Sequence, residues 1–202
     1  MASRISDKLT EWFMKFPGIG PRQARRFVHF LLTQSPAALA EFVELVKRLP
    51  NEVSQCPLCY RFAPVGRDAV CDLCRLGVRD DTTLMVVARD VDLDAVEKSR
   101  VYTGRYFVLG GTLSPLDRDP EKKVRLAELR HRIDQLQKNM TELIVALGAH
   151  AEGDYTTAVI RDAFTQSKFR ISILGRGLST GTELEYSDFD TIQNALKNRI
   201  SQ

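Results

Sequence analysis

The sequence predicts an α+β protein built from several modules: an N-terminal helical unit, a short segment that holds every cysteine, an α/β domain with a parallel sheet, and a C-terminal helix. Three observations carry this prediction. Apolar residues recur every three or four positions over the first 50 residues, which is typical of amphipathic helices. The four cysteines follow close together. From residue 84 onward, short apolar runs alternate with charged helical patterns, which favours parallel strands joined by helices.

The N-terminal unit is predicted to contain three helices. An apolar stripe runs through residues 1–16, and the Pro-Gly-Ile-Gly-Pro sequence of residues 17–21 ends that helix. A second helix follows, with its own apolar stripe from Ala24 onward. Ser35 and Pro36 form an N-cap with proline at the first helical position, so they open a third helix that runs to about Leu49.

The α/β domain is predicted from four apolar runs and the helical patterns between them. The run 84–88, Leu-Met-Val-Val-Ala, is typical of a parallel strand buried on both faces. The predicted strands are 84–88, 106–109, 143–147 and 169–174. The predicted helices between and after them are 92–100, 121–138, 155–165 and 188–200. The predicted domains are the helical unit at residues 1–53, the cysteine segment at 54–77, the α/β domain at 78–175 and the C-terminal segment with its helix at 176–202.

The cysteines give the strongest chemical signal, because they form two C-x-x-C pairs separated by eleven residues. Each pair lets two thiolates reach one ion from a tight turn, and zinc prefers four such ligands in a tetrahedron. The predicted ligands are Cys56, Cys59, Cys71 and Cys74. Four thiolates leave no open coordination position, so we predict one structural Zn²⁺ per chain. Pro57 and the Pro64-Val65-Gly66 stretch supply turn-forming residues.

Two alternatives to zinc exist for these cysteines, a pair of redox dithiols and free cysteines in a core. A thioredoxin-type redox motif needs a single C-x-x-C placed at a helix start after a strand. The compartment is expected to be the reducing cytoplasm, where a paired pattern favours metal over disulfides. No apolar run approaches the roughly 18 residues of a membrane span, so no membrane association is expected.

Positive charge is concentrated near the N-terminus. The chain of 202 residues has a formal net charge of only +3, and its 44% hydrophobic and 27% charged content is ordinary for a soluble globular protein. The first 34 residues, however, hold six lysines and arginines against two acidic residues. This local surplus exceeds the net charge of the whole chain, so the distribution of charge says more about a nucleic-acid partner than the total does.

Residues 16–22, Phe-Pro-Gly-Ile-Gly-Pro-Arg, connect the first two predicted helices. The glycines allow a tight turn and the close approach of another backbone, and the free amides at the start of the next helix favour a phosphate. Three arginines follow at spacings that share one helix face. We interpret the segment as a helix-hairpin-helix, which grips the DNA backbone without reading bases. The predicted DNA-binding residues are Gly18, Gly20, Arg22, Arg25 and Arg26. The alternative is a plain helical hairpin with a solvated basic face.

With these motifs in view, the chain resembles the bacterial recombination mediator family RecR over nearly its whole length. The hairpin and the four cysteines are similar to that family's hairpin and zinc finger. The stretch 108–117, Val-Leu-Gly-Gly-Thr-Leu-Ser-Pro-Leu-Asp, resembles a specific family signature inside a Toprim domain. Arg176-Gly177-Leu178 together with Glu183-Leu184-Glu185-Tyr186 resembles the C-terminal signature.

The resemblance implies a helix-hairpin-helix, a four-cysteine zinc finger, a Toprim domain and a C-terminal helix, in that order. It also implies a role in recombinational DNA repair without catalysis, in which the protein helps to load the recombinase on single-stranded DNA. The implied partners are single- and double-stranded DNA and the RecO and RecF repair proteins. The implied assembly is a homodimer or homotetramer ring that can encircle DNA.

Two departures from the family pattern bear on function. Toprim domains place a glutamate at the end of their first strand, where this chain has Ala88. The second acidic cluster persists as Glu152 and Asp154, which are expected to bind a partner, to form a residual magnesium site, or to lie in a solvated loop. Mg²⁺ needs several oxygen ligands, so the loss of one carboxylate argues against cleavage chemistry. The stretch 136–140 is the second departure, since it is slightly longer than the family norm.

Two other functions compete with the mediator. A Toprim nuclease is disfavoured because Ala88 replaces an acidic residue, and fold alone does not decide function. A pure protein adaptor, whose hairpin serves only oligomerisation, is the other alternative. The chain has no G-x-x-x-x-G-K-[ST] phosphate loop, so ATP hydrolysis is not expected.

Overall fold

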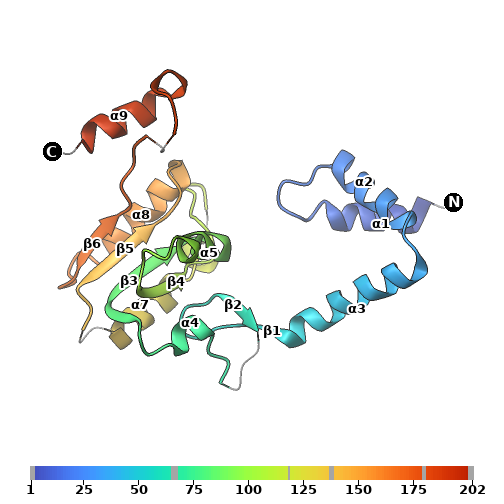
Figure 1. The fold of residues 1–202 in the computed structure, drawn as a ribbon, viewed down its shortest axis with the longest axis horizontal. Helices are drawn as coiled ribbons and strands as arrows, with labels where there is room; N and C mark the ends of the chain where they lie inside the picture. The colour runs from blue at the N-terminus through green and yellow to red at the C-terminus, as the bar shows by residue number, and fades with distance from the viewer. Residues whose placement is uncertain (1–2, 65–67, 118, 137–138, 179–180, 200–202) are drawn as a thin grey trace. The chain divides into compact units, whose positions relative to one another are not determined.

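The computed structural model describes the chain except for residues 1–2, 65–67, 118, 137–138, 179–180 and 200–202. The chain divides into two compact units, Met1–Val53 and Ser54–Gln202. The elements of both units are labelled in Figure 1.

The N-terminal unit consists of α1 (Ser3–Phe13), α2 (Pro21–Leu32) and α3 (Pro36–Glu52). Helices α1 and α2 pack as an antiparallel pair, and Ala24 and Val28 of α2 are buried. The rings of Phe13 and Phe27 meet edge to face, with their centroids 5.5 Å apart. The predicted cap of α3 is confirmed, because the Ser35 hydroxyl accepts a hydrogen bond from the Ala38 amide at 3.2 Å. The helix runs past its predicted end at Leu49 through Pro50 to Glu52.

The second unit is built on a four-stranded sheet of β3 (Asp80–Val87), β4 (Gly104–Val108), β5 (Glu142–Ala146) and β6 (Arg170–Ile173). The strand order is β4-β3-β5-β6, and every pairing is parallel. The prediction of a parallel sheet is therefore confirmed, with β3 as a central strand and β4 at one edge.

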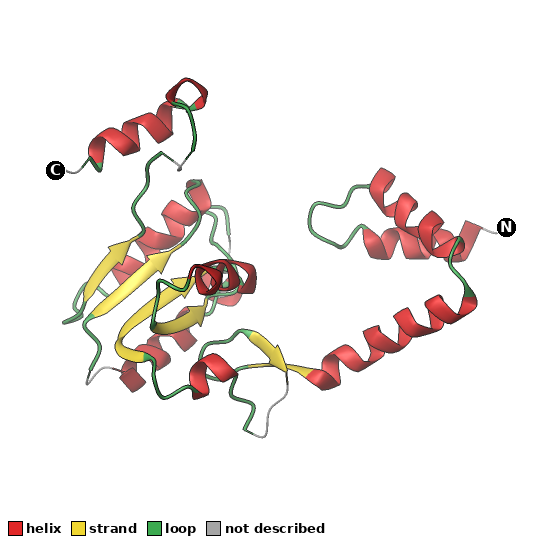
Figure 2. Ribbon diagram, viewed as in Figure 1, coloured by secondary structure: helices red, strands yellow, loops and turns green. Residues whose placement is uncertain are grey.

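Helices cover both faces of this sheet (Figure 2). Leu93 of α5 (Asp90–Ser99) packs on one face with Met85 and Val87 of β3. Helices α7 (Leu126–Leu136) and α8 (Ala151–Ala163) pack on the other face, where Leu84 and Val86 point. Successive residues of β3 are thus buried on opposite faces, which explains why its sequence reads as a continuous apolar run.

Two predicted helices differ from the observed ones. The helix predicted over 121–138 is two helices, α6 (Pro120–Lys123) and α7, with Gln137 and Lys138 outside the described residues. The chain breaks between them because Val124 is buried in the core and the Arg125 amide bonds to the Leu109 carbonyl at 2.9 Å. This long-range contact replaces a helical hydrogen bond and cannot be seen in a local pattern.

The helix predicted over 155–165 begins four residues earlier, at Ala151. His150 is its N-cap, and its Nδ1 atom accepts from the Gly153 amide at 3.2 Å. Histidine is not among the preferred capping residues, so no helix start is predicted at this position. As a result Glu152 and Asp154 lie in the first turn of a helix, and the expectation of a solvated loop is wrong.

The remaining elements frame the cysteines and the C-terminus. The short strands β1 (Val53–Gln55) and β2 (Phe62–Pro64) pair, and α4 (Asp72–Arg75) follows them. After β6, a 3₁₀ turn (Leu184–Tyr186) leads into α9 (Phe189–Lys197). No helix in the described part of the chain is long and apolar enough to cross a membrane.

Candidate metal centre and nucleic-acid interface

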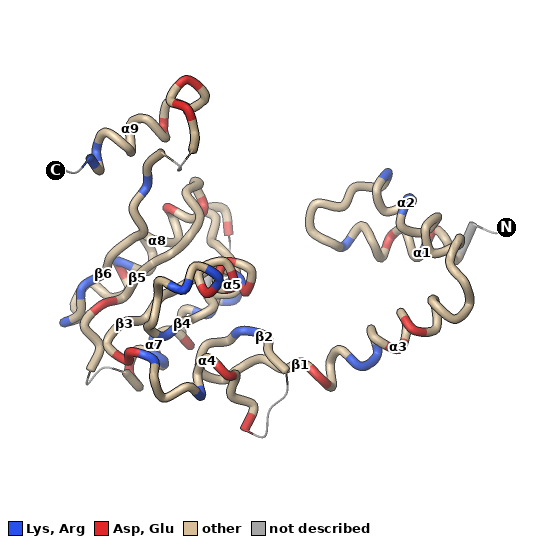
Figure 3. The backbone as a smooth tube through the Cα atoms, viewed as in Figure 1, with Lys and Arg blue, Asp and Glu red and all other residues tan. Residues whose placement is uncertain are grey.

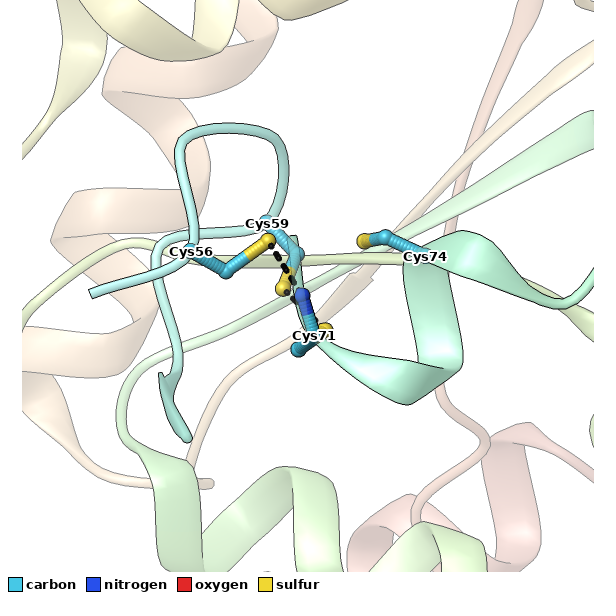
Figure 4. A group of neighbouring side chains, drawn as sticks. All are labelled: Cys56, Cys59, Cys71 and Cys74. Atoms are coloured by element: carbon cyan, nitrogen blue, oxygen red, sulfur yellow. Dashed lines mark hydrogen bonds between the residues drawn. The ribbon is translucent and has the colours of Figure 1, made fainter. Parts of the chain in front are cut away.

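The four cysteines meet at one point between the β1–β2 hairpin and α4 (Figure 4). Their sulfur atoms all lie within 4.8 Å of one another, and the Sγ atoms of Cys59 and Cys71 are 3.5 Å apart. Tetrahedral zinc with Zn–S bonds of about 2.3 Å requires sulfur–sulfur separations of roughly 3.8 Å. Three of the thiols are buried and that of Cys74 is half-buried. The arrangement therefore suits a single four-coordinate metal ion.

Backbone hydrogen bonds shape each C-x-x-C turn. In the first turn the Tyr60 amide bonds to the Cys56 carbonyl at 2.9 Å, with Tyr60 in a left-handed conformation at φ 62°. In the second, the Cys74 amide bonds to the Cys71 carbonyl at 3.1 Å, and the Cys71 amide reaches the Cys56 sulfur at 3.5 Å. The predicted turn at Pro64-Val65-Gly66 lies outside the described residues from Val65 onward.

The close packing of the four thiols shifts their pKa values in both directions. Hydrogen bonding from Cys59, and then from Cys71 and Cys74, lowers the pKa of the Cys56 thiol well below its ordinary value. Metals bind the thiolate form. The pKa of the Cys59 thiol is raised, first by its hydrogen bond with Cys56, so the four thiols do not ionise alike when no metal is bound.

The cysteine segment sits against the edge strand of the sheet. The Val108 amide of β4 donates to the Cys59 carbonyl at 2.7 Å, and the ring of Tyr60 lies 5.3 Å from the ring of Phe107. Every residue of β4 is buried although it is an edge strand. The cysteine cluster is therefore packed against the α/β domain and is not a separate finger.

The hairpin between α1 and α2 is a tight turn of the predicted kind. The Ile19 amide bonds to the Phe16 carbonyl at 3.1 Å, and Gly18 takes φ 74°, a conformation that other residues rarely adopt. Gly20 is the N-cap of α2 and Pro21 follows it in the first turn. A Cβ atom at Gly20 would meet nothing within 4 Å, so the space above this residue is open.

The three predicted arginines belong to α2, and Figure 3 marks basic positions along this helix in blue. Arg22, Arg25 and Arg26 are all exposed, whereas Ala24 and Val28 of the same helix are buried. Within the described part of the chain, none of the three guanidinium groups has a hydrogen-bond or ion-pair partner. Their positive charge is therefore free to act on a ligand beside the start of α2.

The two residues of the acidic cluster do not act together. Glu152 accepts a hydrogen bond from the Thr112 hydroxyl at 3.0 Å, at the carboxyl ends of the strands. Asp154 pairs instead with the guanidinium of Arg176, which follows β6, and this contact lowers the pKa of the Asp154 carboxyl. The two carboxylates line different clefts.

A cleft opens at the carboxyl ends of β3, β4 and β5, where ligands bind in open α/β sheets. It is lined by glycines, by basic and acidic side chains, and by Ala88 at the end of β3. The lining residues are Ala88, Arg89, Asp92, Gly110, Gly111, Thr112, Lys123, Gly148, His150 and Glu152. Among the described residues, the four cysteines are the only cluster of three or more side chains suited to hold a metal ion. The carboxylates that Mg²⁺ needs are not assembled in this cleft, so the residues do not fit a Toprim magnesium site.

Comparison with known proteins defines the class of the α/β domain and then the family of the chain. Residues 82–175 match the family model described as Toprim domain. Over about 95% of its length the chain is similar to proteins named "Recombination protein RecR". That of Prochlorococcus marinus is 38% identical over 95% of this chain and 98% of its own length. Those of Synechococcus sp. and Lactobacillus helveticus are 35% and 32% identical, over 95% and 96% of this chain and 97% and 95% of their own lengths.

The chain belongs to the RecR family, as the resemblance of its motifs predicted. The predicted fold class is also confirmed, since a helical hairpin unit, a four-cysteine cluster, a parallel-sheet Toprim domain and a C-terminal helix follow one another in the chain.

Sequence reasoning missed the residues that attach these parts to one another. Arg105, Arg176 and His150 each make a contact that positions a predicted site residue. Arg176 belongs to the C-terminal signature, but the signature does not indicate its contact with Asp154. Arg105 and His150 belong to none of the predicted motifs, and the uninterrupted burial of β4 became visible only in the folded sheet.

Proposed function

We propose that this protein is a DNA-binding recombination mediator that acts in recombinational repair and has no catalytic activity of its own. In this role it helps to load the recombinase on single-stranded DNA, together with RecO-type and RecF-type partners in the cytoplasm. The observation that carries the proposal is a set of three arginines beside the Gly-Ile-Gly turn, which are exposed and have no partner among the described residues, in a chain of the RecR family.

In this proposal the hairpin of residues 16–22 contacts the phosphate backbone of single- and double-stranded DNA. The open space at Gly20 allows a backbone to approach, and the start of α2 offers amide groups and the positive end of the helix dipole. Arg22, Arg25 and Arg26 add charge on the adjoining face. Such contacts fix position without reading sequence, which suits a protein that must load recombinase on any sequence.

The proposed absence of catalysis rests on the acidic positions expected of a Toprim enzyme. Ala88 stands where a Toprim enzyme has a carboxylate, and Glu152 and Asp154 face different partners. Cleavage of a phosphodiester by a Toprim enzyme needs these carboxylates around magnesium. We propose that Glu152, which is exposed, serves a protein partner, while Asp154 holds the segment after β6 through Arg176.

We propose that the metal is Zn²⁺ and that its role is structural. Cys56, Cys59, Cys71 and Cys74 supply four thiolates, so no coordination position is left for a substrate. When bound, the ion would supply a large part of the folding free energy of a segment too short to bury its own core.

The proposed ring of two or four chains is supported by apolar surface on the N-terminal unit. No described residue of α3 is buried within its own chain, although Phe42, Val46 and Leu49 are large and apolar. A groove beside them is lined mostly by apolar side chains, namely Phe13, Phe27, Phe30, Leu31, Leu39 and Phe42, together with Gln34 and Ala38. Contiguous apolar surface of this kind marks a protein interface, and we propose that a second copy of this chain covers it.

The test compares DNA binding by the wild-type chain and by Arg22→Ala/Arg26→Ala. The matched control is Lys47→Ala/Arg48→Ala, which removes the same charge from α3 of the same unit, where Arg48 is already paired with Glu52. The hairpin variant is expected to bind single- and double-stranded DNA more weakly and to lose recombinase loading, and the control to retain both. Equal binding by the hairpin variant would leave the protein adaptor as the better hypothesis.

A second measurement separates the mediator from a nuclease. Supercoiled DNA incubated with the protein and Mg²⁺ is expected to stay intact. Nicking that Asp154→Ala abolishes would overturn the proposal that the chain has no catalytic activity.

A further inference from the structure

Arg105 extends from β4 to the second C-x-x-C turn. Its side chain is about one-tenth exposed, and its Nη1 atom donates to the carbonyls of Leu73, Cys74 and Leu76 at 3.4, 3.0 and 3.3 Å. Its Nε atom donates to the Asp81 carboxylate at 2.7 Å. One guanidinium group thus links the backbone around Cys74, a predicted metal ligand, to the Asp81 carboxylate on β3.

Those three carbonyls lie at the end of α4, a helix of only four residues. The last carbonyls of a helix have no partners within it, and here they point into the contact between the turn and the sheet. A guanidinium satisfies them with charge-assisted hydrogen bonds. Because Cys74 is one of the residues held, Arg105 fixes the backbone from which the Cys74 thiol projects.

The first C-x-x-C turn is held by the same strand. The Cys59 carbonyl receives the Val108 amide at 2.7 Å. Tyr60 packs with the core on one face of the sheet, and Leu73 of the second turn packs with the core on the other face. The two halves of the metal site therefore attach to opposite faces and to the outer edge of β4.

We propose that Arg105 is a positioning residue for the metal centre, which sets the second C-x-x-C turn at ligand distance from the first and couples metal binding to the order of edge strand β4. The inference rests on the proposed metal-binding role of the four cysteines. A guanidinium anchored on the sheet brings the two turns together before the ion binds, so the ion does not have to assemble four separate thiolates. Its positive charge also offsets the negative charge of a four-thiolate zinc centre.

The experiment measures zinc affinity of the full-length chain by competition with a chromophoric chelator, for wild type, Arg105→Met and Arg79→Met. Arg79 is a matched control because its side chain is equally buried and makes a similar ion pair, to Glu97 at 2.6 Å. Its hydrogen bonds go to Glu97 and Gly104 and, within the described residues, none goes to a cysteine turn. Both variants lose an ion pair, but only Arg105→Met loses the contact with Cys74.

Arg105→Met is expected to bind zinc about 10- to 100-fold more weakly, which is the usual effect of removing a partner of a metal ligand. Arg79→Met is expected to keep the wild-type affinity. The rise in melting temperature that zinc gives should shrink in Arg105→Met and persist in Arg79→Met, a difference that a general loss of stability would not produce. In the wild type, removal of zinc should also speed hydrogen exchange at the Val108 amide.

Equal zinc affinity in wild type and Arg105→Met, or equal losses in both variants, would overturn the role of Arg105. A wild-type chain that binds no zinc at all would overturn the proposed metal site instead, so the two failures are distinct. Should Arg105→Met not fold, Asp81→Asn tests the same contact from an exposed residue. It is expected to weaken zinc binding in the same direction and by less, and an unchanged affinity would count against the proposal.

Discussion

The number of arginines in the hairpin sets how steeply salt is expected to weaken the proposed DNA binding. Each phosphate neutralised on single-stranded DNA contributes about 0.7 to the slope of log K against log salt. Because Arg22, Arg25 and Arg26 are exposed and unpaired among the described residues, each is able to neutralise a phosphate without breaking an internal contact. Three such contacts correspond to a slope of about 2.1 per hairpin. Replacing two of them, as in Arg22→Ala/Arg26→Ala, should lower the slope by about 1.4.

This change in slope means that wild type and variant converge as salt rises. Between 50 and 200 mM salt, the ratio of their affinities should fall about sevenfold for each hairpin engaged. Fluorescence anisotropy with a labelled single-stranded oligonucleotide, measured over a series of salt concentrations, gives both slopes directly. The Lys47→Ala/Arg48→Ala control should give a line parallel to that of the wild type. Parallel lines for the hairpin variant as well would refute the assignment of phosphate contacts to these arginines.

Three further predictions concern the metal centre, the start of α8 and the segment after β6. Cys56→Ser should lose the metal and then unfold or disassemble, and any loss of DNA binding should be a consequence of that. Circular dichroism and mass in solution check this, and a variant that stays folded and oligomeric yet fails to bind DNA would contradict it. Gly153→Ala should destabilise the protein by about 1–3 kcal/mol in urea unfolding, because the added Cβ would lie 2.0 Å from the Gly148 carbonyl oxygen; an unchanged midpoint would show that α8 can shift freely. Asp154→Asn should cost under about 1 kcal/mol, as is usual for exposed ion pairs. Since Arg176 lowers the folded-state pKa of Asp154, the difference from wild type should be constant above about pH 5 and vanish as pH falls through that pKa; a difference that persists at pH 2 would argue against the ion pair.

Local patterns in the chain were sufficient for most elements of the fold. The continuous apolar run at the end of β3 predicted a strand buried on both faces, and Ser35 with Pro36 predicted the start of α3. Both features depend on residues that are neighbours in sequence. The break between α6 and α7 was missed because its cause is a hydrogen bond from Arg125 to the distant Leu109 carbonyl.

The acidic cluster shows the same limit at a functional site. Glu152 and Asp154 are two residues apart, and adjacency in sequence suggested a shared role. Their helix begins at Ala151, so the two side chains project in different directions, one toward Thr112 and the other toward Arg176. Proximity along a helix is not proximity around it, because successive residues are rotated by about 100°.

By itself the sequence determined the four-cysteine cluster and the basic hairpin, because both depend on residue types at short, fixed spacings. Two C-x-x-C pairs specify four thiolates, and a Gly-Ile-Gly turn followed by arginines specifies a charged helix start. Only the tertiary structure decided how the metal centre joins the Toprim domain. That junction is made by Arg105 and Val108 of β4 with Cys59 and Cys74, residues about 30 to 50 positions away, and contacts at such separation arise only when the folded sheet presents its edge to the cysteine turns.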